Sequence, residues 1–159
     1  MSSKDDDPDC DPLFAAIGRF SAAWGHAEFG LDGILRTIHE GRVLPRPDAD
    51  FPISFKNKVR YFRAAIKEGV GPSTQGWISR VCEGLMNRSV MRGRIVHGFL
   101  VEIDPGGAGN FIRAFQRHRY YRLPSTSRYT TKQIMTETID VRQLAGKLIK
   151  LSGELRALR

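Results

Sequence analysis

The stretch that decides the fold reads STQGWISRVCEGLMNRSVMRGRIVHGFLVEID, residues 73–104. Apolar residues recur every three or four positions as far as His97, which is the spacing of one face of an α-helix. After Gly98 the pattern changes to a short apolar run, which is typical of a strand. The sequence therefore predicts a helix over about 73–98 that passes directly into a strand at 99–104.

Two arginines interrupt the apolar face of this helix. With Leu85 as the centre and ~100° per residue, Arg92 falls about 20° from the centre and Arg88 about 60° from it. The expected core residues on this face are Ile78, Val81, Cys82, Val96 and Phe99. Burying an uncompensated charge is costly. We therefore expect Arg92 to have a carboxylate partner, Glu28 or Asp32, or to face a cleft open to an anion.

His97 follows Arg92 in the same helix and carries a side chain that exchanges protons near neutral pH. A straight helix places the two residues about 140° apart and about 7.5 Å along the axis, so no direct contact is expected. A shared phosphate, a kink at Gly93 or Gly98, or a second copy of the chain would bring them together. The structural alternative is that His97 caps the helix or forms a hydrogen bond in the core.

Three further helices are predicted. The first runs over about 12–40 from an Asp11–Pro12 start, and the second over about 55–68 from the cap Ser54. Glycines that would permit close approach to another helix lie in the first, at positions Gly18, Gly25, Gly30 and Gly33. Asp140 and Gln143 form a capping box for the last helix. Its apolar stripe, read as core or as a dimer interface, consists of Val141, Leu144, Leu148, Leu151, Leu155 and Leu158.

The segment between the third and last helices reads as a hairpin. Residues 99–104 and 111–117 form its strands, and the glycine-rich 105–110 forms its turn. Residues 118–137 are irregular or form a short strand. The fold expected is mainly α, an up-down bundle of about four helices with a β-hairpin inserted before the C-terminal helix.

The charge of the chain is unevenly distributed. The 159 residues carry a net +8, but residues 1–11 hold one Lys and five Asp. The rest of the chain holds 24 Lys and Arg against 12 Asp and Glu. We expect a disordered acidic tail at 1–11 and one helical domain at 12–159. A basic body favours a polyanionic partner such as nucleic acid, although the same composition suits a soluble surface.

The cysteines and the hydropathy limit the cellular locations and the kinds of metal site that the sequence allows. Cys10 and Cys82 lie far apart without a CxxC motif, which argues against a cysteine-based zinc site and indicates a reducing, cytoplasmic location. No apolar run reaches the ~18 residues of a membrane span, and the acidic start is not a secretory signal. The sequence indicates no metal site and no cofactor.

Residues 111–129, FIRAFQRHRYYRLPSTSRY, interleave arginines with aromatic residues. Aromatic faces stack on bases and guanidinium groups hold phosphates, so Arg117 and Arg119 are candidates for binding single-stranded RNA. The alternative is a hairpin with one solvated face and one packed face.

The pattern Arg92-x4-His97, the ending Arg94–Gly98 (RIVHG) and the early pair Trp24 and Glu28 are similar to the HEPN family, the higher eukaryotes and prokaryotes nucleotide-binding domains. A long motif helix and a final helix that packs back on the bundle agree with this resemblance. One departure is Gly93, where the family commonly has Asn or another polar residue after its arginine.

The resemblance implies a metal-independent endoribonuclease, with attack of an RNA 2′-hydroxyl on the adjacent phosphate. Arg92 and His97 would be catalytic, and Arg88, Arg94, Arg117 and Arg119 would bind substrate. The implied partners are RNA, a second copy of the chain and an antitoxin, in a toxin or defence system. The alternative is a catalytically inactive HEPN-like binding or assembly module, in which Arg92 and His97 hold structure.

Overall fold

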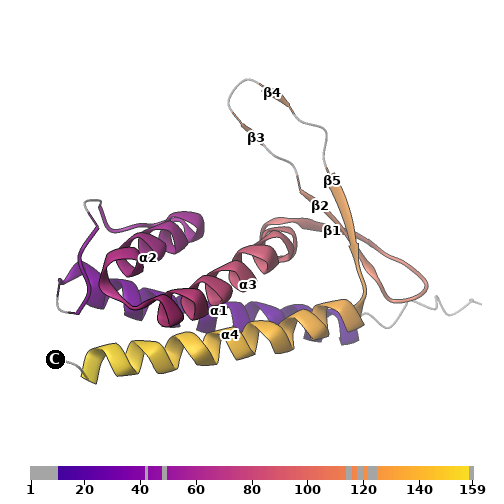
Figure 1. The fold of residues 1–159 in the computed structure, drawn as a ribbon. Coiled ribbons are helices and arrows are strands. Elements are labelled where there is room, and N and C mark those ends of the chain that lie inside the picture. Colours follow the sequence, from indigo (N-terminus) through magenta and orange to yellow (C-terminus); the bar gives the residue numbers. More distant parts are fainter. Residues whose placement is uncertain are drawn as a thin grey trace, which may run out of the picture. The chain divides into compact units, whose positions relative to one another are not determined.

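The structure, a computed structural model, describes residues 11–41, 43–47, 50–113, 116–117, 120–121 and 125–157. Its helices are α1 (Asp11–His39), α2 (Phe55–Gly69), α3 (Pro72–His97) and α4 (Thr131–Ala157) (Figure 1). Its strands are β1 (Phe99–Ile103), β2 (Gly109–Arg113), β3 (Gln116–Arg117), β4 (Tyr120–Tyr121) and β5 (Ser125–Tyr129). The mainly α fold with β structure before the C-terminal helix is therefore confirmed. The acidic tail expected at 1–11 lies, except for Asp11, outside the described residues.

Two compact units divide the chain, and each is described by itself. The helical unit comprises Ala23–Arg88 and Asp140–Arg159, and the sheet unit comprises Met1–Ala22 and Ser89–Ile139. Helices α1, α3 and α4 each contribute residues to both units. The single domain expected over 12–159 stays a prediction.

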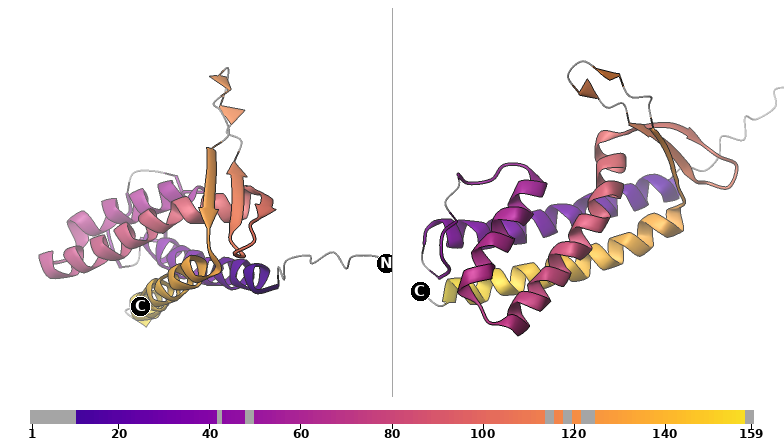
Figure 2. Two further views of the ribbon diagram at one scale, coloured as in Figure 1. Left: turned by 90° about the vertical axis from the view of Figure 1, so that its right-hand side faces the viewer. Right: turned by 45° about the horizontal axis from the view of Figure 1, so that its top comes forward.

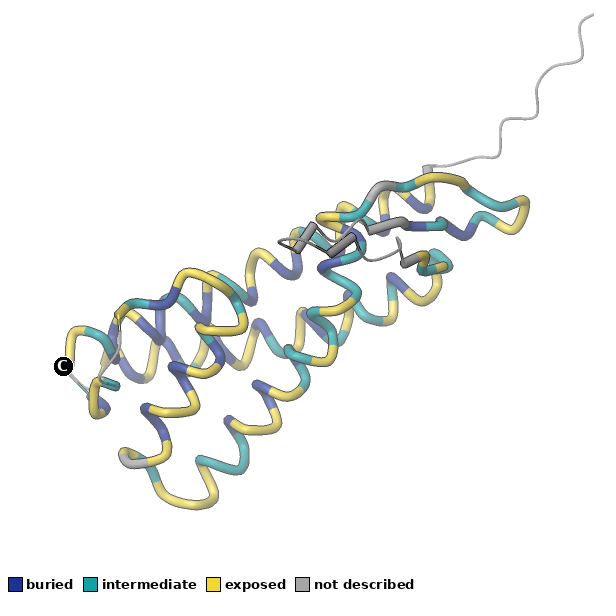
Figure 3. Tube along the Cα trace, turned by 90° about the horizontal axis from the view of Figure 1, so that it is seen from above, coloured by how far each residue is buried: buried dark blue, intermediate teal, exposed yellow. Residues whose placement is uncertain are grey.

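Apolar side chains from all four helices form the core of the helical unit. Figure 3 shows buried positions recurring along each helix between exposed ones, which is the pattern of amphipathic helices. The largest fully buried side chains of this unit are Leu31, Ile34, Leu35, Ile38, Val59, Phe62, Leu85 and Leu148. Leu148 belongs to the stripe expected on the last helix, so at least this part of the stripe is core.

Specific polar and ring contacts attach α2 to α1. Ser54 caps α2, as expected, because its Oγ accepts a hydrogen bond from the backbone N–H of Asn57 at 3.4 Å. The ammonium of Lys58 lies 2.7 Å from a carboxylate oxygen of Asp32. The rings of Trp24 and Phe55 lie 5.0 Å apart. These contacts hold the buried face of α2 against α1.

Glycines let α1 and α4 approach closely, as the sequence predicts for Gly30 and Gly33. A Cβ at Gly30 would lie 3.0 Å from the Cβ of Leu148. A Cβ at Gly33 would lie only 2.5 Å from Oγ of Ser152. Since Gly18 and Gly25 have no such neighbour within 4 Å, only two of the candidate glycines serve this purpose.

The sheet unit holds a three-stranded antiparallel sheet in the order β1-β2-β5 (Figure 2). The third strand, β5, lies in the segment that was expected to be irregular or a short strand. Phe111 of β2 is buried and contacts Tyr129 of β5, with ring centroids 5.9 Å apart. A Cβ at Gly109 would lie 3.0 Å from Leu13 of α1, so the sheet packs closely on that helix. The short strands β3 and β4 pair with each other as a separate ribbon.

Asp104 organises the turn between β1 and β2. Its Oδ1 accepts hydrogen bonds from the backbone N–H groups of Gly106 and Ala108, each at 3.0 Å. Its other oxygen accepts from Arg128 of β5 at 2.7 Å. Gly107 has a φ of +73°, which explains a glycine there. The backbone N–H groups of this turn are thus used internally, in agreement with a hairpin turn.

The start of α4 corrects the sequence prediction. The helix begins at Thr131, well before Asp140. The backbone N–H of Thr130 donates to the side chain of Gln133 at 2.8 Å, and the backbone N–H of Gln133 donates back to Thr130 Oγ1 at 3.1 Å. This is the reciprocal capping box that was assigned to Asp140 and Gln143. Both of those residues lie within the helix instead.

The core face of α3 also differs from the prediction. Leu85 is buried as expected, but Val96 is 43% exposed and Ile95 is buried in its place. At ~100° per residue, Ile95 lies about 80° round the helix from Leu85. The two ends of α3 belong to different units, so a single straight stripe does not describe both.

No helix of the described ranges is both long and apolar enough to span a membrane.

Candidate functional site

Arg92 and His97 meet at the end of α3 in the sheet unit. Their side chains are joined by a hydrogen bond between Nη1 of Arg92 and Nε2 of His97, 2.8 Å long. His97 is exposed and Arg92 is partly buried. The site therefore combines a fixed positive charge with an imidazole that solvent reaches.

This contact corrects the expectation that the two residues do not touch. His97 is the last residue of α3, and β1 begins at Phe99. Since the helix ends there, the imidazole is free of the next helical turn. The arginine side chain is long enough to reach along and around the last turn toward it. Ile95 lies between Arg92 and His97 in the sequence. Its side chain is buried and anchors this end of α3 in the core.

The hydrogen bond between Arg92 and His97 fits one tautomer of the imidazole. A guanidinium group has only donors, so Arg92 donates and Nε2 of His97 accepts. Nε2 therefore carries no proton, and the neutral ring holds its proton on Nδ1. In this arrangement the lone pair of Nε2 is engaged by Arg92.

Arg88 has a different environment, in the helical unit. Its guanidinium donates to a carboxylate oxygen of Asp140 on α4 and, through Nη1, to the backbone oxygen of Gly84 at 3.2 Å. The side chain of Arg88 is 23% exposed and that of Asp140 is 39% exposed. A small hollow of about 140 Å³ beside this pair is lined by Arg88, Asp140, Gln143, Leu144 and Lys147. Arg88 thus has a carboxylate partner on α4, whereas the sequence predicted a carboxylate partner for Arg92, from Glu28 or Asp32.

The two acids proposed as partners of Arg92 make other contacts. Asp32 forms its ion pair with Lys58 of α2. Glu28 accepts a hydrogen bond from the indole N–H of Trp24 at 2.9 Å. Both contacts lie in the helical unit, where they join residues of α1 and α2 or brace α1 itself.

The remaining candidates for substrate binding are placed as follows. Arg94 lies in the last turn of α3 and is partly buried. Arg117 lies in β3, but its side chain is outside the described part of the structure, and Arg119 lies outside the described residues altogether. The structure therefore brings Arg92 and His97 together and leaves the other assignments as predictions.

Within the described ranges, no group of three or more His, Cys, Asp and Glu side chains is arranged to hold a metal ion. Cys82 is a buried free cysteine. Burial raises the pKa of its thiol, and nearby Arg63 opposes this shift only in part. Such a thiol is a poor nucleophile, so Cys82 is a core residue.

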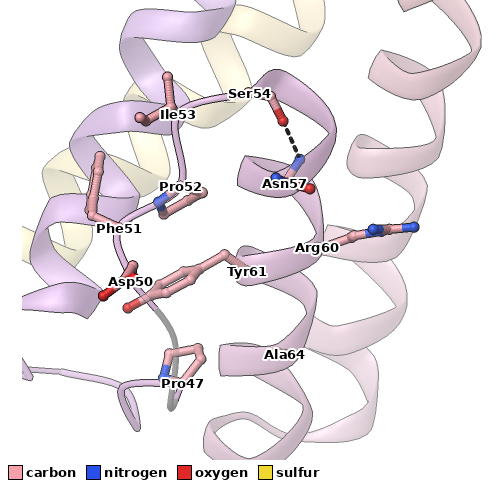
Figure 4. A pocket seen from close by; sticks show the side chains of 10 residues that line it. All are labelled: Pro47, Asp50, Phe51, Pro52, Ile53, Ser54, Asn57, Arg60, Tyr61 and Ala64. Carbon is pink, nitrogen blue, oxygen red and sulfur yellow. Dashed lines mark hydrogen bonds between the residues drawn. The ribbon is translucent and has the colours of Figure 1, made fainter. Parts of the chain in front are cut away.

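Sequence reasoning missed a second hollow, in the helical unit between residues 50–54 and α2. It has a volume of about 630 Å³ (Figure 4). Tyr61 lies in its wall and forms a 2.9 Å hydrogen bond with Nδ1 of His39, whose ring meets Phe51 edge-on. Its signal in the sequence is the group of proline and aromatic residues around Phe51 and Pro52, a pattern that also predicts a loop.

Comparison of the chain with family models, curated proteins and solved structures finds no match.

Proposed function

We propose that this protein is a metal-independent endoribonuclease in which Arg92 and His97 form the catalytic pair. The observation that carries the proposal is the 2.8 Å hydrogen bond between the Arg92 guanidinium and Nε2 of His97 at an exposed position. A guanidinium group stabilises charge on phosphoryl oxygens, and a neutral imidazole accepts a proton from a hydroxyl group. Cleavage at an RNA phosphate needs both functions within a few ångströms.

Binding of the substrate would convert the resting pair into a working one. A phosphate forms stronger, charge-assisted and bidentate hydrogen bonds with a guanidinium than a neutral imidazole does. When Arg92 turns to the phosphate, Nε2 of His97 is released. It then removes the proton of the 2′-hydroxyl, the 2′-oxygen bonds to phosphorus, and the bond from phosphorus to the 5′-oxygen breaks. The products are a 2′,3′-cyclic phosphate and a 5′-hydroxyl.

The departing 5′-oxygen also needs a proton. A single imidazole that has just accepted one at Nε2 is badly placed to deliver it to the opposite side of phosphorus in the same step. In a homodimer, His97 of a second copy would supply this acid. A homodimer with RNA as substrate is therefore part of the proposal, as are a cytoplasmic location and control by an antitoxin protein.

The direct test is incubation of the purified chain with RNA in EDTA. Wild type should cleave, and Arg92→Ala and His97→Ala should each lose at least about a hundredfold in rate. His26→Ala is the matched control, because His26 is an exposed histidine of α1 without an assigned role. Its rate should equal that of wild type. No cleavage by wild type, or cleavage that survives both substitutions, would reject the proposal.

A second candidate function is a binding or assembly module without ribonuclease activity. The ion pair between Arg88 and Asp140 favours it, since an arginine of the same helix has a structural partner there. RNA binding by wild type that survives His97→Ala, without cleavage by either protein, would support this module.

A further inference from the structure

One face of α2 carries a row of positive charges, here called the α2 stripe, which consists of Lys56, Arg60, Arg63 and Lys67. Of these, Arg63 also lies beside the buried thiol of Cys82. All of these residues are exposed. At ~100° and ~1.5 Å per residue, they lie within about 60° of one another and extend over about 16 Å of helix. Like charges at such spacings disfavour an isolated helix. A row of this kind therefore gains from an extended anionic partner.

The larger hollow borders this stripe. Arg60 belongs to both, while Asn57 and Ala64 of the hollow's wall lie about 80° round the helix from the stripe. Figure 4 shows Tyr61 directed into the hollow toward Asp50, whereas the Arg60 side chain extends away from the loop. The apolar recess and the charged row are thus neighbouring faces of one helix.

The hollow has the character of a site for a flat, partly polar group. Aromatic and proline side chains form much of its wall, through Phe51, Pro52 and Tyr61. Asp50 and Asn57 add hydrogen-bonding groups at its edge. Ile53, also in the wall, is 91% exposed, which leaves a large apolar side chain in water. The volume of the hollow, about 630 Å³, lies in the range of small-molecule sites.

We propose that this surface binds a single polynucleotide strand, with phosphates along the α2 stripe and one base in the hollow. Proteins that bind single strands combine a basic track with aromatic or apolar surfaces for the bases, and both components occur here side by side. The proposal goes beyond the ribonuclease function and does not require Arg92 or His97 to be catalytic.

The details favour a nucleic acid over an acidic peptide. The negative charge of Asp50 at the edge of the hollow repels phosphates and acidic side chains alike, so only its hydrogen-bonding capacity separates the two partners. The same carboxylate accepts hydrogen bonds from the amino and imino groups of a base. The guanidinium group of each arginine in the stripe can also form two parallel hydrogen bonds with a pair of phosphate oxygens.

The first experiment measures the phosphate contacts. A short fluorescent 2′-O-methyl oligouridylate, which has no 2′-hydroxyl to attack the phosphate, is titrated with wild type and with the double variant Lys56→Glu and Lys67→Glu in EDTA. Loss of two phosphate contacts should reduce affinity by about 25-fold at 0.1 M salt and the slope of log K against log salt by about 1.4. Circular dichroism confirms that the variant is folded.

A matched control makes the same change of charge elsewhere. Lys132 and Arg142 are exposed residues of α4, outside the stripe and the hollow. The double variant Lys132→Glu and Arg142→Glu should bind within about threefold of wild type, because neither residue belongs to the proposed strand-binding surface and exposed charges that make no phosphate contact act only through salt-screened interactions. If the control loses as much as the α2 variant, net charge alone explains binding and the proposal fails.

The second experiment measures how much a base in the hollow contributes to affinity. An abasic strand of equal length should bind wild type about tenfold more weakly than the oligouridylate, as expected for loss of base stacking. Ala64→Leu partly fills the hollow from an exposed position and should remove this difference while leaving the salt slope unchanged. Equal binding of both strands by wild type would overturn the base site.

Displacement of RNA by polyglutamate at equal charge concentration would reassign the surface to an acidic peptide. Because cleavage enters neither experiment, failure here is distinguishable from failure of the ribonuclease proposal.

Discussion

Arg88 and Arg92 lie one turn apart in α3 and were assigned to the same apolar face, yet they have different partners. Arg88 is joined to the carboxylate of Asp140 in the helical unit. Arg92 is hydrogen-bonded to the neutral imidazole of His97 in the sheet unit. The bond to Asp140 compensates the charge of Arg88, whereas a hydrogen bond to a neutral imidazole does not by itself compensate the charge of an arginine. The ribonuclease proposal therefore assigns the phosphate to Arg92 and a structural role to Arg88.

An arginine within an apolar stripe therefore does not by itself indicate a functional site. In the proposed function, Arg88 with its carboxylate partner holds structure, and Arg92 beside the exposed imidazole of His97 takes part in the reaction.

The largest effect is expected at the imidazole-bound arginine. If Arg92 and His97 work on the same step, the double variant Arg92→Ala and His97→Ala should cleave RNA no more slowly than the worse single variant, a loss of about 10²–10⁴. Rates are measured under single-turnover conditions in EDTA. Losses that multiply would show that the two residues act independently, against the catalytic pair.

At the carboxylate-bound arginine, the expected loss is in stability. Because the pair is partly buried, Arg88→Met or Asp140→Ala should each lower the free energy of unfolding by about 1–2 kcal/mol, with a coupling near 1 kcal/mol in the double-mutant cycle. Urea unfolding gives these values. The control cycle uses Lys150 and Glu154, which are 79% and 59% exposed, and should couple by no more than ~0.5 kcal/mol. Equal coupling in the two cycles would remove the structural role of Arg88.

A third arginine, Arg128, extends the comparison to the hairpin turn. Hydrogen bonds from the Ala108 backbone N–H and from Arg128 hold the pKa of Asp104 below its ordinary value of 3.8. A lowered folded-state pKa contributes stability that is present above the unfolded value and is lost as pH falls through the folded one. The stability difference between wild type and Asp104→Asn should therefore shrink as pH falls below about 3.8. A difference that is constant down to pH ~2 would contradict this account.

The smallest expected effect is a change in the NMR spectrum of the His97 imidazole. In wild type, two-bond ¹H–¹⁵N correlations should show His97 with an unprotonated Nε2 and a proton on Nδ1 at a pH where the ring is neutral. Arg92→Ala should shift the ring toward the other tautomer, since the donor to Nε2 is lost. A spectrum that does not respond to Arg92→Ala would show that the hydrogen bond does not select the tautomer.

Most of the fold was predictable from local patterns. The cap Ser54, the helix over 73–98 and the change to a strand after Gly98 each depend on neighbouring residues, and each is confirmed. The start of α4 was not predicted, because Thr130 and Gln133 offer the same capping chemistry as Asp140 and Gln143. Asp140 instead lies inside α4, where it forms a tertiary ion pair with Arg88 that no local pattern predicts.

The candidate site was predictable in identity but not in geometry. Helical periodicity placed Arg92 and His97 on different sides of α3, and periodicity contains no information about where a helix ends relative to a long side chain. The hollow beside α2 was not predictable either, because it depends on how residues 50–54 return across the helix. Long-range proximity of this kind has no local sequence signal.

The most direct test of the catalytic pair identifies the ends of the RNA fragments by mass spectrometry after incubation in EDTA. The account predicts 2′,3′-cyclic phosphate and 5′-hydroxyl ends from wild type and none from His97→Ala. Fragments that end in 3′-hydroxyl and 5′-phosphate groups, or cyclic phosphates formed equally by His97→Ala, would contradict it.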